Sequence, residues 1–343
     1  MEYRTLGRSG CAVSTLCLGT MTFGAESDEK VSHAQLDRFA EAGGTFVDTA
    51  DVYSAGESER IIGHWFASRP ADLTERIVLA TKGRFPLGGT AQEPNAAGLS
   101  ARHLTRALDT SLARLGLGTI DLYQAHAWDA LTPLEETLRT FDSFVRAGKI
   151  RYYGFSNFTG WQLTKAVRLA HELGVAAPVS LQPQYSLLVR EIEWEIVPAA
   201  QDAGLGLLPW SPLGGGWLSG KYVRDQRPTG DTRLGDNPDR GMEAWERRGT
   251  ERTWNVIDAV QRVAEGRGVS MAEVALAWVT DRPGVTSTIL GARTIEQLDA
   301  NLKAAGLHLT EAEAAVLDEA SDPHASDYPY GELGIGQRHR GIN

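Results

Sequence analysis

Short apolar runs alternate with longer amphipathic runs along most of the chain. Several of the short runs are almost continuously apolar, which is typical of parallel strands that are buried on both faces. Eight such runs predict strands at residues 14–20, 45–50, 77–82, 120–126, 150–156, 179–185, 206–211 and 286–292. The alternation predicts a parallel sheet, and eight repeats favour its closure into a (β/α)8 TIM barrel.

The amphipathic runs predict the helices between these strands. Apolar residues recur three and four positions apart in residues 103–117, 132–149 and 159–174. Thr132 and Pro133 fit an N-cap residue followed by a proline at the first helical position. An open doubly wound sheet is the alternative architecture, but no Gly-x-Gly-x-x-Gly motif follows the first strand, which counts against a Rossmann half.

Two segments interrupt the alternation. Residues 213–245 are rich in Gly, Pro, Asp and Arg and predict a long loop after the seventh strand. Long loops in compact domains are usually functional. Residues 321–343 predict an extended C-terminal tail. Because no internal boundary or low-complexity segment is evident, we expect residues 1–343 to form a single domain.

The composition limits the classes of molecule that the chain is expected to bind. With 42% hydrophobic and 23% charged residues the chain is of ordinary globular type, and its formal net charge of −10 repels nucleic acid and anionic lipid. Cys11 and Cys17 are a poor disulfide framework and too few for a metal site. The first residues lack a secretory apolar region, and no apolar stretch approaches twenty residues. We therefore expect a cytoplasmic protein without a membrane or nucleic-acid partner.

Polar side chains gather at the ends of three successive predicted strands. Asp48 and Tyr53 follow the second strand, Lys82 the third and His126 the fourth. Each residue alone has an ordinary explanation as a solvated lysine, a structural histidine or a packed tyrosine. In a barrel the carboxyl ends of neighbouring strands converge, so these four side chains are expected to meet.

Such a group has a definite chemistry. Tyrosine is a poor acid at neutral pH, and a nearby lysine lowers its pKa. Asp48 would keep Lys82 charged, and His126 could donate a hydrogen bond to a carbonyl oxygen. Together they predict a proton donor for a carbonyl oxygen that gains negative charge. The hydride for such a reduction must come from a cofactor, because no side chain supplies it.

The chain resembles the aldo-keto reductases, and its pattern is similar to the branch that includes bacterial general-stress and sugar reductases and potassium-channel β subunits. The resemblance rests on GTMTFG (19–24), DTADVY (48–53), LATKG (79–83), LYQAHAWD (122–129), GFSNF (154–158), PWSPLGGGWLSGKY (209–222) and LGARTIEQLDANL (290–302). It implies that Asp48, Tyr53, Lys82 and His126 form the family's catalytic tetrad. It also implies an N-terminal β-hairpin, turning at residues 8–10, that caps the bottom of the barrel.

The resemblance further implies a nicotinamide dinucleotide, bound without a Rossmann domain. Ser156, Asn157 and Gln182 match the groups that hydrogen-bond the nicotinamide carboxamide, and Trp210 matches the aromatic residue that stacks under the ring. Consecutive glycines let backbone N–H groups approach a pyrophosphate. Further cofactor contacts are expected at Gly19, Thr20, Met21, Ser211, Pro212, Leu213, Gly214, Gly215, Leu218, Gly220 and Lys221.

The adenosine end is expected at the start of the helix after the eighth strand, since a helix N-terminus suits a phosphate. Contacts are predicted at Gly291, Arg293, Gln297 and Asn301. The chain departs from the family pattern in two places, with Ala300 where many members have an acid and Gln297 where short-loop members have an arginine. Arg233 of the long loop is either a further phosphate contact or a solvated charge. These arginines favour NADPH over NADH.

Aromatic residues after the first four strands would line a mouth above the nicotinamide. Phe23, Phe85 and Trp128 join Tyr53 there, and Tyr328 and Tyr330 of the tail are further candidates. Such a mouth suits sugars, aromatic aldehydes and apolar ketones alike. We therefore predict an NADPH-dependent reductase of aldehydes or ketones acting on a small-molecule substrate, and a homo-oligomer is compatible with the sequence.

Two alternatives stay open. One is a nucleotide-binding regulatory subunit that resembles the channel β subunits. The other is an unrelated barrel enzyme, such as a metal-dependent hydrolase, which needs a carboxylate and histidine metal set at the strand ends. Only Asp48 and His126 offer such ligands, so no metal site is predicted.

Overall fold

The computed structural model describes residues 1–86, 93–230, 232–237, 239 and 241–338. Eight parallel strands form one sheet, in which neighbours pair in chain order and the last strand pairs with the first. The strands are β3 (Leu16–Gly19), β4 (Phe46–Asp48), β5 (Val78–Gly83), β6 (Ile120–Ala125), β7 (Ile150–Ser156), β8 (Ser180–Gln182), β9 (Gly206–Leu207) and β10 (Thr288–Leu290). Each predicted strand range matches one of them, although β5 ends one residue beyond its predicted range.

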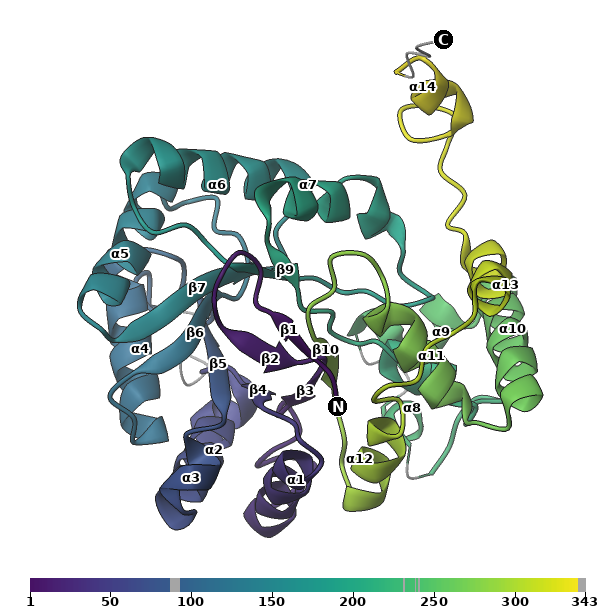
Figure 1. Ribbon diagram of the computed structural model, residues 1–343, viewed down its shortest axis with the longest axis horizontal. Helices are drawn as coiled ribbons and strands as arrows, with labels where there is room; N and C mark the ends of the chain where they lie inside the picture. The colour runs from purple at the N-terminus through teal and green to yellow at the C-terminus, as the bar shows by residue number, and fades with distance from the viewer. Residues whose placement is uncertain (87–92, 231, 238, 240, 339–343) are drawn as a thin grey trace.

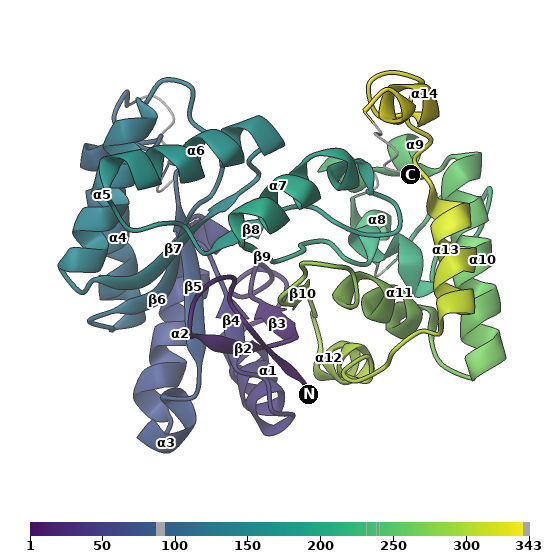
Figure 2. The ribbon, with the colours of Figure 1, turned by 45° about the horizontal axis from the view of Figure 1, so that its top comes forward.

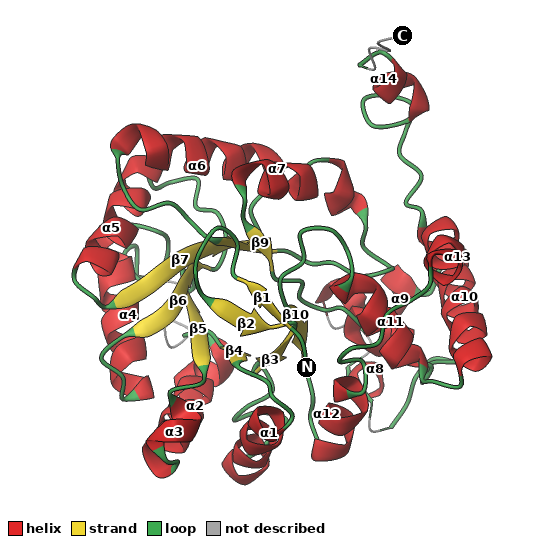
Figure 3. Cartoon of the chain, in the orientation of Figure 1, coloured by secondary structure: helices red, strands yellow, loops and turns green. Residues whose placement is uncertain are grey.

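Backbone hydrogen bonds close the sheet between β9 and β10. The Leu207 N–H donates to the Gly284 carbonyl, the Thr286 N–H donates to the Leu207 carbonyl, and the Ile289 N–H donates to the Pro209 carbonyl, each at 2.9 Å. Figure 3 shows the strands at the centre and the helices around them. The predicted (β/α)8 barrel is confirmed.

Helices follow the strands and pack on the outside of the sheet (Figure 1). They are α1 (Glu29–Glu41), α2 (Glu57–Ser68), α3 (Ala71–Thr74), α4 (Ala101–Leu115), α5 (Leu134–Arg146), α6 (Gly160–Leu173), α7 (Ile196–Ala203), α11 (Met271–Thr280) and α12 (Ile295–Leu302). The predicted start of α5 is one residue early. Pro133 is its N-cap residue, and Thr132 instead donates its hydroxyl proton to Asp129 at 2.6 Å.

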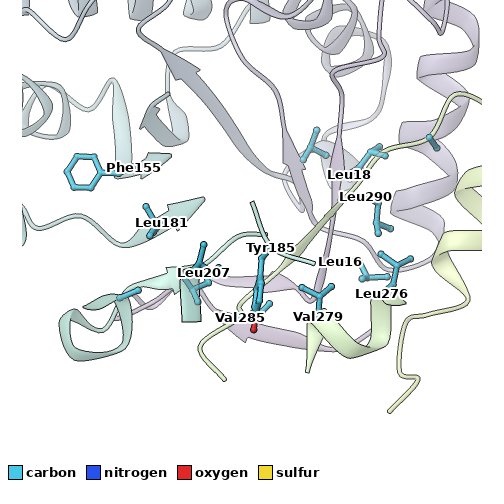
Figure 4. Close-up of a cluster of buried hydrophobic side chains, with 14 of the residues drawn as sticks. Leu16, Leu18, Phe155, Leu181, Tyr185, Leu207, Leu276, Val279, Val285 and Leu290 are labelled. Carbon is cyan, nitrogen blue, oxygen red and sulfur yellow. The ribbon is translucent and has the colours of Figure 1, made fainter. Parts of the chain in front are cut away.

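A hydrophobic layer between strands and helices holds the barrel in shape. In Figure 4, Leu16, Leu18 and Leu290 of the strands lie beside Leu276 and Val279 of α11. All five side chains are at most 2% exposed. Burial of this size is worth about 1.5–3 kcal/mol for each large side chain, so the positions of the strand ends are fixed by packing rather than by the loops that follow.

An N-terminal hairpin closes one end of the barrel, as predicted. β1 (Tyr3–Thr5) and β2 (Ala12–Ser14) are antiparallel, and the Arg8 N–H donates to the carbonyl of Gly204 at 3.0 Å, just before β9. Gly7 has φ +55°, and a Cβ there would collide with the Val179 carbonyl. The hairpin therefore covers the amino ends of the strands and leaves the carboxyl ends for a site.

Leu6 and Val13 of the hairpin plug the barrel interior. Both are fully buried, and they pack with inward-facing side chains of the strands, namely Cys17, Phe46, Ala80, Leu122, Leu208 and Ile289. The lower half of the barrel is thus a closed apolar core. The polar interior begins only at the layer of Asp48 and Lys82.

The segment after β9 is more ordered than a loop. Residues 213–245 contain η4 (Gly214–Ser219), α8 (Arg233–Asp236), η5 (Gly241–Glu243) and the start of α9 (Trp245–Arg248), with residues 231, 238 and 240 outside the described part. Trp217 stacks on Trp245 at 4.9 Å and lies edge-on to Trp254 at 5.6 Å. This aromatic cluster fixes the segment to α10 (Glu251–Arg267).

The C-terminal residues lie at the side of the barrel. α10 and α13 (Glu311–Ser321) run side by side at the outer edge, and the chain then leads away to α14 (Glu332–Gly336), as Figures 1 and 2 show. Tyr330 stacks on Trp194 of η3 (Glu191–Trp194) at 5.7 Å, and Tyr328 is 71% exposed. The Tyr330 ring therefore packs on Trp194, and the Tyr328 side chain is largely exposed. Within the described residues, no helix is both long and apolar enough to cross a membrane.

Candidate active site

Lys82 is the centre of a buried polar cluster at the carboxyl ends of the strands. Its Nζ donates to Asp48 Oδ1 at 2.6 Å, to the Thr49 carbonyl at 2.7 Å and to the Tyr53 hydroxyl at 3.2 Å. The Lys82 side chain is fully buried and that of Asp48 is 3% exposed. The three contacts satisfy all three ammonium protons, so the lysine is held in one position. The predicted meeting of Asp48, Tyr53 and Lys82 is confirmed.

The charge on Lys82 is maintained by its neighbours. Burial alone would lower the pKa of Lys82, but the charge of Asp48 and the contact with Tyr53 outweigh burial and raise it. The sequence predicted that Lys82 lowers the pKa of Tyr53. It does act in that direction, but burial of the phenol prevails, and the pKa of Tyr53 lies above its ordinary value. Tyr53 therefore carries its proton at neutral pH.

Two glutamines complete the environment of Asp48. Gln124 Nε2 donates to Asp48 Oδ2 at 3.2 Å, and Gln182 Nε2 donates to the same oxygen at 3.0 Å. Gln182 was predicted as a cofactor contact, whereas Gln124 was missed. In the sequence, Gln124 stands out as a polar residue within an apolar strand, two positions before His126 and thus on the same face. In the structure its side chain is fully buried.

His126 lies beside the tyrosine. Its ring meets that of Tyr53 edge-on at 5.9 Å and that of Phe85 edge-on at 4.8 Å. Burial, together with the cations of Lys82 and Arg84, holds the pKa of His126 well below its usual value. The imidazole is therefore neutral at pH 7, which keeps one ring nitrogen as a hydrogen-bond donor. All four predicted tetrad residues come together.

The predicted nicotinamide residues form a connected set. Trp210 Nε1 donates to Asn157 Oδ1 at 3.1 Å, and Asn157 Nδ2 donates to the His126 carbonyl at 3.0 Å. The Ser156 hydroxyl donates to the Gln182 carbonyl at 2.9 Å. Asn157 adopts φ +58°, an uncommon conformation that its own hydrogen bonds hold. These residues link the tetrad to the strand end that carries Trp210.

The predicted pyrophosphate residues form a tight turn after Trp210. Gly214, Gly215 and Gly216 all have positive φ, and Ser211 has φ +55°. A Cβ at Gly216 would collide with the Lys221 side chain, so the glycines bring that lysine close to the backbone. Leu218 is less suited to its predicted role, since its side chain is fully buried and its N–H donates to the Leu213 carbonyl at 3.2 Å. Pro212 is also buried, and Gly220 is exposed.

Three cations approach one another next to this turn. Burial and the charges of Arg293 and Arg233 lower the pKa of Lys221. Lys221 follows the end of η4, Arg233 begins α8, and Arg293 lies in the loop before α12. Arg293 also pairs with Glu26, with 3.9 Å between Nε and Oε2, and the three cations together form a positive region. This arrangement fits the phosphates of a dinucleotide.

The remaining predicted cofactor residues are placed as follows. Gln297 Oε1 accepts from the Arg293 N–H at 2.9 Å, and Asn301 Nδ2 donates to the Gly291 carbonyl at 3.3 Å. Thr20 is fully buried and bonds Asp48 and Ser58, so its side chain serves the fold. A Cβ at Gly19 would press on Ile289, while Gly291 faces open space and Met21 is 41% exposed.

The predicted substrate residues separate into two groups. Phe85 meets the ring of His126 edge-on, whereas Trp128 packs edge-on against Phe158 and Trp161. Phe23, by contrast, is fully buried in the hydrophobic core. Its ring offers no surface to a substrate, so the structure does not support that prediction. Phe23 comes soon after strand β3, and its side chain points into the core and not toward the mouth of the site.

A second buried carboxyl lies just outside the tetrad. Asp51 is 1% exposed, and both of its carboxyl oxygens are buried without a hydrogen-bond partner within the described residues. Burial and the charge of Glu59 raise the pKa of Asp51 to about 8. No role was predicted for Asp51 from the sequence. No set of three or more histidine, cysteine or acidic side chains in the described residues is arranged to hold a metal ion.

Comparison with known proteins agrees with the geometry of the site. A sequence model of the Aldo/keto reductase family matches residues 15–322. The uncharacterized oxidoreductase YrpG of Bacillus subtilis is 40% identical over 90% of this chain and 92% of its own. A probable voltage-gated potassium channel subunit beta of Oryza sativa is 37% identical, covering 89% and 91%. The versiconal hemiacetal acetate reductase of Aspergillus parasiticus is 33% identical, covering 95% and 98%.

Proposed function

The chain belongs to the aldo/keto reductase family, whose members are NAD(P)H-dependent oxidoreductases, and we propose that it uses NADPH to reduce aldehydes or ketones to alcohols, with Tyr53 as the proton donor. One observation carries the proposal: Lys82 Nζ bridges Asp48 Oδ1 at 2.6 Å and the Tyr53 hydroxyl at 3.2 Å. This contact assigns separate tasks to the three side chains.

Lys82 leaves the phenolic proton of Tyr53 available. Because the ammonium donates to the Tyr53 oxygen, the hydroxyl must direct its own proton elsewhere. A carbonyl oxygen above Tyr53 would accept that proton as its negative charge develops. The positive charge of Lys82 then stabilises the phenolate that remains. Asp48 holds the ammonium in place and balances its charge.

His126 would orient the same carbonyl oxygen. As a neutral imidazole it donates one hydrogen bond without competing with Tyr53 as an acid. Two donors aimed at one oxygen fix the carbonyl carbon relative to the cofactor and stabilise the developing charge. Bound NADPH supplies the hydride that this carbon receives.

The residues around the site fit the cofactor. Trp210, Asn157 and Ser156 would hold the nicotinamide, and the glycines from Gly214 would hold the pyrophosphate. Lys221, Arg233 and Arg293 gather positive charge that favours a 2′-phosphate. A charge-assisted hydrogen bond contributes about 1.5–3 kcal/mol, so NADPH is expected to bind about tenfold tighter than NADH.

Titration of both cofactors tests this preference. In Arg293→Ala, alone or with Arg233→Ala, most of the preference should disappear while NADH affinity changes little. Equal affinities in the wild type, or a preference that neither substitution alters, would show that the phosphate end is misassigned.

Turnover on a panel of aldehydes and ketones tests the proposed reaction. The wild type should quench or shift NADPH fluorescence on binding and then oxidise NADPH when a carbonyl substrate is added. Binding without turnover on any substrate would favour the second candidate, a nucleotide-binding regulatory subunit, which the likeness to a channel β subunit supports. No binding at all would contradict both candidates.

A further inference from the structure

Arg84 stands at the mouth of the site, one step above the catalytic layer. Lys82 is level with Gln124 across β5 and β6, and the His126 N–H donates to the Gly83 carbonyl at 3.1 Å. Arg84 is therefore level with His126. Because side chains alternate along a strand, Arg84 shares the inward face with Lys82, whereas Gly83 faces the helices.

The guanidinium of Arg84 is held in place by uncharged groups. It lies over the Phe85 ring at 4.8 Å, and its Nη2 donates to the Trp128 carbonyl at 3.3 Å. Its Nε is buried and has no hydrogen-bond partner in the described part of the chain. The ring covers one face of the guanidinium plane, and the contact with Trp128 fixes its rotation.

Arg84 forms no salt bridge with the carboxylates of the described residues. The charge of Arg84 helps to lower the pKa of Asp129, but the Asp129 carboxylate accepts its hydrogen bonds from the Leu99 N–H at 2.8 Å and the Thr132 hydroxyl at 2.6 Å, not from Arg84. Arg114, which is also partly buried, is instead paired with Glu59 at 3.0 Å. In a chain of net charge −10, an immobilised arginine without a carboxylate partner beside the reacting position is a feature that needs a ligand to complete it.

We propose that Arg84 is a specificity-determining residue that binds a carboxylate on the carbonyl substrate, so that the preferred substrates are oxo acids. This inference rests on the proposed reductase function. The planar fork of arginine matches a carboxylate, and the edge that carries Nη1 is left for it. Since Arg84 is level with His126, the carboxylate must lie a short distance from the reacting carbonyl.

A set of carboxybenzaldehydes tests the proposal. The 2-, 3- and 4-carboxy isomers are compared with their methyl esters, which keep the carbonyl and the ring but lack the charge. For at least one isomer, wild-type kcat/KM for the acid should exceed that for the ester by about tenfold, mainly through KM. Arg84→Met should remove this ratio and leave the ester within about threefold of wild type.

Three further variants exclude simpler explanations. Arg84→Gln keeps a donor for the Trp128 carbonyl but has no charge, so it should behave like Arg84→Met even if the latter folds poorly. Arg84→Lys should retain part of the preference. Arg76→Met, at an exposed position just before the same strand, makes the same charge change and should alter nothing. Thermal midpoints of all variants report on folding.

The outcomes separate the two proposals. No preference in the wild type, or an equal loss for acid and ester in Arg84→Met, overturns the role of Arg84. A phosphorylated aldehyde that is preferred over every carboxybenzaldehyde would also overturn the carboxylate assignment. If no carbonyl is reduced, the reductase function fails, and the role of Arg84 is then decided by benzoate titration of the NADP⁺-saturated protein. Benzoate should bind wild type and not Arg84→Met, with benzamide as the neutral control.

Discussion

Asp48 and Asp51 are three residues apart and almost equally buried, yet their environments are opposite. Asp48 faces the barrel axis and accepts hydrogen bonds from Lys82, Gln124 and Gln182. The carboxyl oxygens of Asp51 have no partner within the described residues. Asp51 lies in the layer between strands and helices, where its main neighbours are Glu59 of α2 and Arg114 of α4.

One cation cannot satisfy both acids of that layer. Arg114 Nη1 donates to Glu59 Oε2 at 3.0 Å and to the backbone carbonyl of Asp51 at 3.0 Å, so the side chain of Asp51 is left out. Burial and the charge of Glu59 then favour the protonated acid. The comparison shows that equal burial leaves one carboxyl group fully hydrogen-bonded and the other without a side-chain partner, depending on the residues that the neighbouring elements supply.

The largest effect is expected when Lys82 is removed, because Asp48 then becomes a buried acid without a cation. Lys82→Met should abolish carbonyl reduction at neutral pH and destabilise the fold by about 3–5 kcal/mol. Urea unfolding and single-turnover NADPH oxidation measure the two effects. Lys165→Met, on the exposed surface of α6, is the matched control and should resemble wild type. Wild-type rates in Lys82→Met would remove Lys82 from the mechanism.

Replacement of Asp51 should stabilise the fold, whereas replacement of Lys82 should destabilise it. The folded-state pKa of about 8 exceeds the usual value of 3.8, so between those limits the folded protein binds a proton that the unfolded chain releases. Stability from this group is therefore complete below about pH 4 and is lost as the pH rises to about 8. Asp51→Asn should avoid this loss and be more stable than wild type at pH 8, by as much as about 5 kcal/mol.

Unfolding free energies at a series of pH values measure this difference. The advantage of Asp51→Asn should grow steadily from pH 4 to pH 8 and then stay constant. Asp202→Asn, on the exposed end of α7, serves as the control and should follow wild type. A variant that tracks wild type across the whole range would mean that Asp51 is ionised in the folded protein.

The contrast between Asp48 and Asp51 was only partly predictable from the sequence. Apolar runs identified all eight strands, because burial on both faces leaves a continuous signal, and the residues at their ends identified the tetrad. The partners of Asp48 could not be identified in the same way, since Gln124 of β6 and Gln182 of β8 lie on strands that do not pair with β4 and reach Asp48 only across the closed barrel. Phe23 and Asp51 show a second limit of the sequence. Both lie near strand ends, but their side chains turn away from the mouth of the site.

A smaller effect should follow from neutralising Glu59. In Glu59→Gln the like charge beside Asp51 is gone and Arg114 is no longer shared with a second acid. The pKa of Asp51 should fall by about one unit, which corresponds to about 1.4 kcal/mol at pH 8. In Glu59→Gln, the loss of stability with rising pH should therefore end at a lower pH than in wild type. An unchanged end point would show that burial, rather than Glu59, holds the proton on Asp51.

The role of the Asp48 cluster is tested most directly by Tyr53→Phe. NADPH dissociation constants and single-turnover rates of NADPH oxidation are measured for this variant and wild type with the same aldehyde. Because the substitution removes the acid and leaves the cofactor contacts, NADPH affinity should stay nearly unchanged while the rate falls by orders of magnitude. A variant that keeps most of the wild-type rate would contradict the assignment of Tyr53 as the proton donor.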